Sequence, residues 1–183
     1  MRDAGCGIPL PFRTPHTAPR TLMADLQRLW APWRHRYLSR AGPGRCIFCA
    51  AKRSTDDRRH HVIARGRRVF ALLNRYPYNN GHLMVAPYRH VGRLESLSPA
   101  EWAESLRLLR RLLRRLNTTL HPHGFNLGAN LGRVAGAGIP GHLHLHLVPR
   151  WRADTNFMPV LANTKVISQS LDELYRVLTD RPA

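Results

Sequence analysis

Short apolar runs and one long amphipathic segment alternate along the chain and predict its secondary structure. The predicted strands cover residues 62–64, 69–73, 82–87, 125–131 and 142–148. Pro77 and the run Asn79-Asn80-Gly81 lie between two of these apolar runs and predict a hairpin-like unit. Helices are predicted from residue 98 to about 120 and near 168–178. This order of elements is typical of an α+β domain built on an antiparallel sheet.

The long helix carries both a start signal and an amphipathic pattern. Ser98 occupies the capping position, Pro99 the first helical position, and Glu101 follows three residues after the cap. Arginines fill most sites between the stripe leucines, which are Leu106, Leu109, Leu113, Leu116 and Leu120. We expect the leucines to pack on the sheet and the arginines to face water. A membrane-surface or nucleic-acid-binding helix has the same pattern and is the alternative.

The chain is strongly basic, with a formal net charge of +18 from 29 Lys+Arg and 11 Asp+Glu. Only Lys52 and Lys165 are lysines, and this preference for arginine favours a coding bias over selection for nucleic acid. The charge still attracts anionic substrates. The arginines occur without interleaved aromatic residues or a recognisable motif, so a nucleic-acid-binding module is the weaker hypothesis. No apolar run approaches the roughly 20 residues that span a bilayer, so we expect no membrane partner.

The first residues differ in composition from the rest of the chain. Residues 1–22 are rich in Pro, Gly and Arg without an apolar period, so we expect residues 1–26 to form a disordered extension. Residues 27–183 are then a single catalytic domain, in which Trp30 and Trp33 form an aromatic anchor. The cysteine count of three argues against a disulfide framework and favours a reducing, cytoplasmic location.

Three histidines alternate with leucines in the segment GHLHLHLVPRW. Because side chains alternate along a strand, His142, His144 and His146 share one face, and the leucines between them face the helix. Three polar rings on an otherwise apolar strand have three interpretations: a metal site, a phosphate site with a nucleophilic imidazole, or a structural cluster.

The loop before these histidines favours the phosphate site. Asn130, Gly132, Gly136 and Gly138 provide a side-chain amide and a backbone that can approach phosphate oxygens closely. A neutral imidazole attacks phosphorus at neutral pH without prior deprotonation, and a neighbouring histidine can protonate the leaving phosphate.

At these residues the chain resembles the histidine triad family, whose signature matches His142 to Val148 completely. The resemblance extends to LWAPWR, CIFC, FALLNRYPYNNGHLMVAPYRH, NLGRVAGAGIPGH and DTNFMPVLANTK, and it is strongest for the bacterial branch related to diadenosine tetraphosphate phosphorylases. It implies a HIT-like fold, in which a long helix packs on an antiparallel sheet and a second helix follows at the C-terminus. It also implies an oligomer, a dimer or tetramer with the sheet continued across two subunits.

The resemblance assigns roles to individual residues. His142, His144 and His146 become the catalytic triad, with His144 as the nucleophile that carries AMP and His146 as the residue that binds and protonates phosphate oxygens. Asn130 positions the α-phosphate and Asn74 contacts the ribose. Gly136 and Gly138 are the predicted phosphate-binding glycines, and Trp151 resembles an aromatic residue of the phosphorylase branch.

The resemblance implies two half-reactions. His144 first displaces ATP from diadenosine tetraphosphate, and orthophosphate or water then releases the bound AMP as ADP or AMP. The loop departs from many relatives, because Ala137-Gly138-Ile139 stands where they carry a Ser or Gln. The acceptor therefore stays open between a phosphorylase and a hydrolase, and a nucleoside phosphoramidate hydrolase is a further alternative.

Cys46 and Cys49 have the spacing of half a metal site, in a predicted knuckle before the charged turn at residues 52–61. Two free thiols under the N-terminal segment are the alternative. In zinc-bearing relatives, the resemblance adds His90 and His142 as the other ligands; His60 or His61 could replace one of these. Such a zinc would be structural, because a closed four-ligand site leaves no position for substrate.

Overall fold

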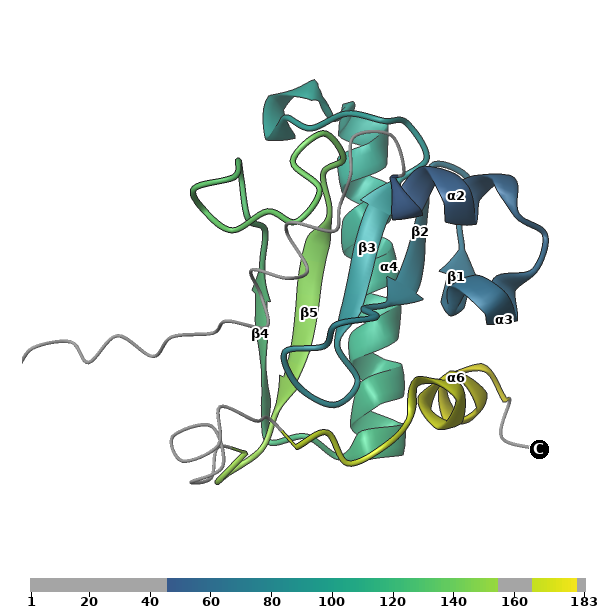
Figure 1. The fold of residues 1–183 in the computed structure, drawn as a ribbon, viewed down its shortest axis with the longest axis vertical. Helices are drawn as coiled ribbons and strands as arrows, with labels where there is room; N and C mark the ends of the chain where they lie inside the picture. Colours follow the sequence, from purple (N-terminus) through teal and green to yellow (C-terminus); the bar gives the residue numbers. More distant parts are fainter. Residues whose placement is uncertain (1–45, 155–165, 181–183) are drawn as a thin grey trace, which may run out of the picture. The chain divides into compact units, whose positions relative to one another are not determined.

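The computed structural model describes residues 46–154 and 166–180, which form one antiparallel sheet with helices on both faces (Figure 1). Neighbouring strands follow the order β1-β2-β3-β5-β4, and all four pairings are antiparallel. The strands are β1 (Val62–Arg65), β2 (Val69–Leu73), β3 (Leu83–Pro87), β4 (Gly124–Gly128) and β5 (Leu145–Arg150). The α+β architecture predicted from the sequence is confirmed.

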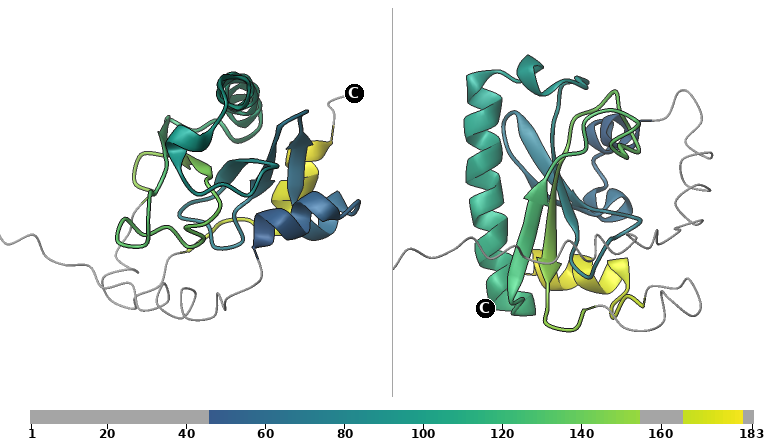
Figure 2. Two further views of the ribbon diagram at one scale, coloured as in Figure 1. Left: turned by 90° about the horizontal axis from the view of Figure 1, so that it is seen from above. Right: turned by 90° about the vertical axis from the view of Figure 1, so that its left-hand side faces the viewer.

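The helices differ in length and in the face of the sheet that they cover. They are α2 (Ile47–Arg53), α3 (Asp57–His60), the 3-10 helix η1 (Leu94–Ser96), α4 (Pro99–Leu120) and α6 (Leu171–Thr179). The long α4 covers one face and α2 lies over the other, as the two turned views in Figure 2 show. Within the described ranges, no helix is both long enough and apolar enough to cross a membrane.

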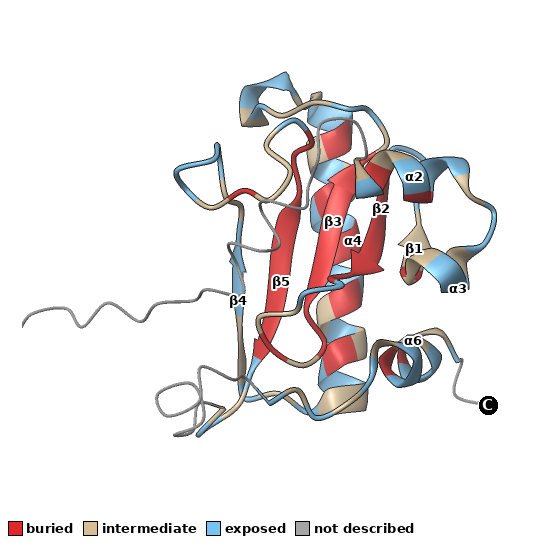
Figure 3. Cartoon of the chain, viewed as in Figure 1, coloured by how far each residue is buried: buried red, intermediate tan, exposed pale blue. Residues whose placement is uncertain are grey.

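Alternation along the central strands divides the core into two clusters. In β2, Val69, Ala71 and Leu73 pack with the leucines of α4 and α6, whereas Phe70 and Leu72 face α2. Every residue of β2 and β3 is buried, which Figure 3 shows as red strands between the helices. The edge strand β4 is half-buried to exposed. The sheet therefore has an apolar α4 face and a second face on which polar side chains can be placed.

The start of α4 is as predicted, but the face that it buries is rotated relative to the predicted leucine stripe. The Ser98 side chain accepts a hydrogen bond from the Glu101 backbone N–H, and Glu101 reciprocates at the Ser98 N–H. The leucines that face the sheet are Leu108, Leu109, Leu112 and Leu116, while Leu106 is 58% exposed. The stripe prediction was wrong at Leu106 because buried Glu101 and Ser105 lie on the same face and shift its centre towards Leu108 and Leu112.

Several element boundaries also differ from the predictions. The predicted knuckle and charged turn form α2 and α3 instead, and Asp56 caps α3 by accepting from the Arg59 N–H at 3.0 Å. The strand that carries the triad histidines begins at Leu145 rather than at His142, because its pairing with β3 extends only as far as Val85↔Leu145. The preceding strand ends at Gly128 and the C-terminal helix begins at Leu171.

Some predictions concern residues outside the described ranges. These are the extension at residues 1–26, the domain boundary after it, the aromatic anchor at Trp30 and Trp33, and residues 155–165 of the polar connection.

Candidate active site

His144 lies on the α2 face of the sheet, with one ring nitrogen fixed by the backbone. Its Nδ1 is 2.8 Å from the His142 carbonyl oxygen, and a carbonyl only accepts hydrogen bonds. The proton of neutral His144 therefore resides on Nδ1, and the Nε2 lone pair is left for another partner. Burial lowers the pKa of His144, which keeps the ring neutral near pH 7. This is the tautomer that a nucleophilic imidazole needs.

The tautomer of His146 is set through a neighbour, His82. The Tyr78 backbone N–H donates to Nδ1 of His82 at 3.0 Å, so neutral His82 carries its proton on Nε2. That Nε2 is 2.9 Å from Nδ1 of His146, which must accept. His146 then holds its own proton on Nε2. Burial, and next the positive charge of nearby His146 and His144 when protonated, lower the pKa of His82 to about 3.

Sequence reasoning missed His82 as a site residue. It was placed only at the start of a predicted strand, after the turn Asn79-Asn80-Gly81. The signal that could have found it is a histidine at the start of a strand whose other residues are all apolar. Its side chain is 1% exposed.

Phe48 of α2 packs against two of the triad rings. Its ring centroid lies 4.9 Å from that of His142 and 4.8 Å from that of His144, and its side chain is fully buried. The phenyl ring excludes water on one side of both imidazoles, which contributes to the burial that keeps them neutral. Phe48 stands between the two cysteines in sequence, so α2 connects the triad to the cysteine pair.

Cys46, Cys49, His90 and His142 converge at one point, as the sequence predicted for a metal site. Their four donor atoms lie within 4.8 Å of one another. The contacts are 3.2 Å from Cys46 Sγ and 3.7 Å from Cys49 Sγ to His142 Nδ1, and 3.3 Å from Cys49 Sγ to His90 Nδ1. A tetrahedral zinc with usual bond lengths has ligand atoms about 3.3–3.8 Å apart, so the donor set fits. His60 and His61 are not part of this cluster.

Both ring nitrogens of His142 have partners, and Nδ1 faces the cluster. Its Nε2 lies 2.8 Å from the Pro87 carbonyl oxygen, so Nε2 carries the proton and Nδ1 presents its lone pair to the cysteines. Burial, the largest cause, lowers the pKa of His142 to about 4, which leaves the ring neutral as a metal ligand must be. Its ring is therefore occupied, and only its carbonyl reaches His144.

The glycine loop and Asn130 lie beside the triad. Asn130 Nδ2 is 3.5 Å from both the Tyr78 hydroxyl and the Gly136 carbonyl oxygen, and the Tyr78 ring contacts that of His146. Gly136 has φ +87° and its N–H donates to the Arg133 carbonyl, so this glycine shapes the loop. Gly138 follows on the same loop, two residues further and half-buried.

Asn74 lies at the end of β2, where its buried side chain is held by the hairpin. Its Oδ1 accepts from the Tyr76 N–H at 2.9 Å, and its Nδ2 is 3.3 Å from Nδ1 of His82. A cavity of about 570 Å³ begins beside it, lined by Leu72, Leu73 and Ile47 among others.

The cavity next to Asn74 is within reach of the triad along the sheet. Leu72, Met84 and His146 are direct neighbours across β2, β3 and β5. Two strand spacings separate the first from the last, or about 10 Å. A group bound at His146 can therefore extend over Met84 into this cavity.

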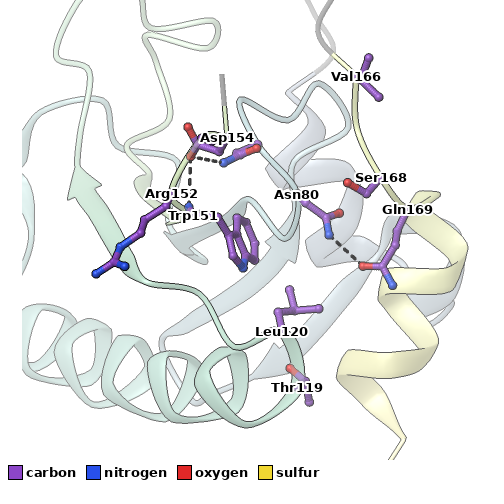
Figure 4. Close-up of a pocket in the computed structure, with 11 residues that line it drawn as sticks. Asn80, Thr119, Leu120, Trp151, Arg152, Asp154, Val166, Ser168 and Gln169 are labelled. Carbon is purple, nitrogen blue, oxygen red and sulfur yellow. Dashed lines mark hydrogen bonds between the residues drawn. The ribbon is translucent and has the colours of Figure 1, made fainter. Parts of the chain in front are cut away.

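Trp151 is not brought to the triad. It follows the end of β5, five residues beyond His146, which corresponds to about 16 Å of extended chain. It lines a second cavity of about 500 Å³, whose walls include Asn80, Leu120 and Gln169 but none of the triad residues (Figure 4). Trp151, which was predicted to contact the substrate, therefore lines a cavity that is separate from the triad.

A family model for the HIT domain matches residues 56–153. The chain belongs to the histidine triad (HIT) family. It is 44% identical to an AP-4-A phosphorylase of Mycobacterium tuberculosis over 84% of this chain and 83% of that protein. It is also 32% identical to a bis(5'-nucleosyl)-tetraphosphatase of Schizosaccharomyces pombe over 51% of this chain and 50% of that protein. These two relatives are a nucleotide phosphorylase and a nucleotide hydrolase, and this HIT chain is an enzyme.

Solved structures support the same assignment. A Zn-bound histidine triad family protein from Mycobacterium smegmatis superposes with a TM-score of 0.58 and 26% identity, covering 73% of this chain and 90% of that one. Both the family and the fold expected from the triad motif are confirmed. In this HIT chain, the rings of His82, His144 and His146 lie next to one another, while His142 lies in the cluster with Cys46, Cys49 and His90.

Proposed function

We propose that this HIT enzyme cleaves diadenosine tetraphosphate by phosphorolysis, through a covalent AMP intermediate on His144. The observation that carries the proposal is that the tautomers of two neighbouring histidines are fixed by hydrogen bonds. Nε2 of His144 is unprotonated, and Nε2 of His146 carries a proton. One nitrogen attacks phosphorus and the other donates to its oxygens. The identity with the mycobacterial AP-4-A phosphorylase supports this choice of substrate.

In the first half-reaction, His144 Nε2 attacks the α-phosphorus. The P–N bond forms as the bond between that phosphorus and the bridging oxygen breaks, and ATP departs with the bond electrons. His144 keeps its Nδ1 proton and becomes a cationic phosphoimidazolium. The His142 carbonyl accepts from this Nδ1–H at 2.8 Å, and its partial negative charge stabilises the cation as it forms.

His146 acts as a hydrogen-bond donor to phosphate oxygens. Neutral His146, which accepts from His82, would become an anion if it gave up its Nε2 proton. A polyphosphate leaves as a stable anion and needs only the hydrogen bond, whereas an amine must be protonated. The relay of His82 and His146 therefore supports a polyphosphate substrate over a nucleoside phosphoramidate.

In the second half-reaction, an oxygen of orthophosphate attacks the same phosphorus. The P–N bond breaks, its electrons return to His144 Nε2, and ADP is released. Water in place of phosphate gives AMP, which is the hydrolase alternative. Asn130 and Gly138, in the loop beside the triad, are proposed to hold the phosphate oxygens.

The nucleoside of the transferred AMP is proposed to occupy the cavity lined by Ile47, Leu72 and Leu73. Its position supports this, because it lies along the sheet from His146 and opens beside Asn74. Asn74 is proposed to meet the ribose hydroxyls. The cavity also has polar walls, formed by Arg59, His60, His61, Arg75 and Asp172, so an apolar side and a polar side are both available to a purine and its ribose.

We propose zinc as the occupant of the Cys46, Cys49, His90 and His142 cluster. Two thiolates and two imidazoles are a donor set that zinc prefers, and the four ligands leave no open position. Its contribution would be structural, because it joins α2 to the segment that carries the triad.

Two wider properties belong to the same proposal. The enzyme is proposed to act in the cytoplasm, where two cysteines available as metal ligands stay reduced. It is proposed to be a homo-oligomer, a dimer or tetramer, since β4 is an edge strand of the sheet within the described residues and carries Leu127 at 54% exposure.

The test compares the intact chain with His144→Ala on diadenosine tetraphosphate, with and without orthophosphate. ATP plus ADP that requires phosphate, and is lost in the variant, is the expected result. ATP plus AMP regardless of phosphate would establish the hydrolase instead. His121→Asn is the matched control, because it replaces an exposed histidine at a left-handed position that asparagine tolerates. Equal turnover by His144→Ala would refute the proposal.

A further inference from the structure

The cavity beside Trp151 is a built site that the reaction at His144 does not use. Trp151, Leu120 and Asn80 come from the end of β5, the end of α4 and the β2–β3 turn, so three separate elements form its walls. Its volume of about 500 Å³ is that of a pocket for a small molecule. In Figure 4 the indole of Trp151 lies at the centre of these residues.

Asn80 provides an acceptor in the wall of this cavity. Its Nδ2 donates to Gln169 Oε1 at 2.8 Å, which fixes the amide. Its Oδ1 is closed off from water, and no residue in the described ranges donates a hydrogen bond to it. A buried acceptor without a donor costs about 1–3 kcal/mol. A ligand N–H relieves this cost if it reaches Oδ1 when the Asn80 side chain turns and its bond to Gln169 is exchanged for the ligand.

The rest of the wall favours a neutral, flat ligand. Asp154 carries a negative charge, but Arg150 pairs with it through two nitrogens, and Asn79 Nδ2 donates to it at 2.8 Å. Arg152 extends away from Asn80 and Gln169 in Figure 4. An indole face, the apolar side chain of Leu120 and the Asn80 amide oxygen match a planar ring with an exocyclic amine.

We propose that this cavity is a second nucleoside-binding site, in which an adenine-type base stacks on Trp151 and donates its amine to Asn80 Oδ1. The β2–β3 turn connects it to the triad, because the Tyr78 ring lies 5.5 Å from that of His146 and Asn79 lines the cavity. Its occupant is either the distal nucleoside of a dinucleotide or a free nucleoside. The first of these sources rests on the proposed function.

Equilibrium dialysis with adenosine tests the site without any turnover. We expect two adenosines per chain for the intact protein and for His144→Ala, and one for Trp151→Ala. Trp151→Phe keeps an aromatic face and should keep the second adenosine, which controls for a folding defect. The loss of stacking should weaken the second site about tenfold or more. A Trp151→Ala chain that binds as many adenosines as the intact chain would overturn the proposal.

Inosine tests the role of the amine, since it carries a carbonyl in place of the amine of adenosine. The second site should bind inosine about tenfold more weakly, and Asn80→Leu should remove this preference. Equal binding of both nucleosides to the intact second site would exclude Asn80 as its acceptor and overturn that contact.

Kinetics separate the two sources of the nucleoside. If the distal nucleoside is the occupant, Trp151→Ala lowers kcat/KM for diadenosine tetraphosphate but not for an AMP ester with a small leaving group. If a free nucleoside is the occupant, Trp151→Ala loses the second adenosine and changes both substrates equally or not at all. His144→Ala separates the two proposals. Its expected loss of all turnover tests the proposed function, and its expected binding of both adenosines tests the second site.

Discussion

At the scale of single residues, the reactive state of the site depends on which nitrogen of each histidine holds the proton. The motif of alternating histidines identifies His144 and His146, but it says nothing about their tautomers. Those are fixed by the His142 carbonyl and by His82, which is distant in sequence. His82 could not be assigned from the sequence, because its contact with His146 depends on the pairing of β3 with β5.

Replacing His82 should therefore impair the reaction without removing the nucleophile. His82→Leu takes away the donor to His146 Nδ1, and we expect kcat to fall by about a hundredfold. His82→Gln, which can place an amide donor near the same point, should recover part of this loss. Steady-state kinetics with diadenosine tetraphosphate give the comparison, and circular dichroism checks the fold. An unchanged kcat in His82→Leu would contradict the relay.

The lowered pKa of His82 also predicts how stability depends on pH. The folded value of about 3 lies below the ordinary 6.5, so the unfolded chain binds an additional proton between these values. Stability from this residue is complete above about pH 6.5 and is lost as pH falls towards 3, with a slope up to about 1.4 kcal/mol per pH unit.

Urea unfolding at several pH values measures this slope. The slope between pH 6 and 4 should be smaller in His82→Leu than in the intact chain. Equal slopes in the two proteins would show that His82 does not titrate with folding.

At the scale of elements, the strands and the start of α4 could be predicted, but the short charged helices could not. The capping box at Ser98 and Glu101 is a local signal, and it is found as expected. By contrast, α3 has no apolar residue, and the seven-residue α2 is too short to show a helical period and is stabilised by burying Phe48 and Ala51 against the sheet. Local patterning does not contain that contact, so the segment was predicted as a knuckle and a turn.

The proposed metal centre would link α2 to the triad, so its loss should affect both stability and rate. Cys49→Ser should lower bound zinc from one per chain to none and reduce Tm by about 5 °C or more, since each 1 kcal/mol shifts Tm by about 2–4 °C at this size. The kcat should also fall, because Phe48 no longer holds His144 in place.

Chelator supplies the matched control for this variant. It should lower Tm in the intact chain and leave Cys49→Ser unchanged. A full equivalent of zinc in Cys49→Ser, or an intact chain insensitive to chelator, would rule out the assigned ligand set.

At the scale of the whole molecule, the sheet brings three distant segments together at one place. Residues 46–49, 82–90 and 142–146 meet on the α2 face, while α4 closes the other face with leucine. The chain's net charge of +18 should speed the approach of polyphosphates at low salt. The family motif predicted the triad and the metal ligands, whereas the distant location of Trp151 required the three-dimensional path of β5 and α4.

The covalent intermediate tests the central claim most directly. The intact chain would be mixed with diadenosine tetraphosphate without orthophosphate, quenched in alkali to preserve phosphohistidine, and digested for mass spectrometry. The account predicts AMP attached to His144, absent in His144→Ala and released as ADP when phosphate is added before the quench. AMP on His146 or on another residue, or turnover with no adduct on the rapid-quench timescale, would contradict it.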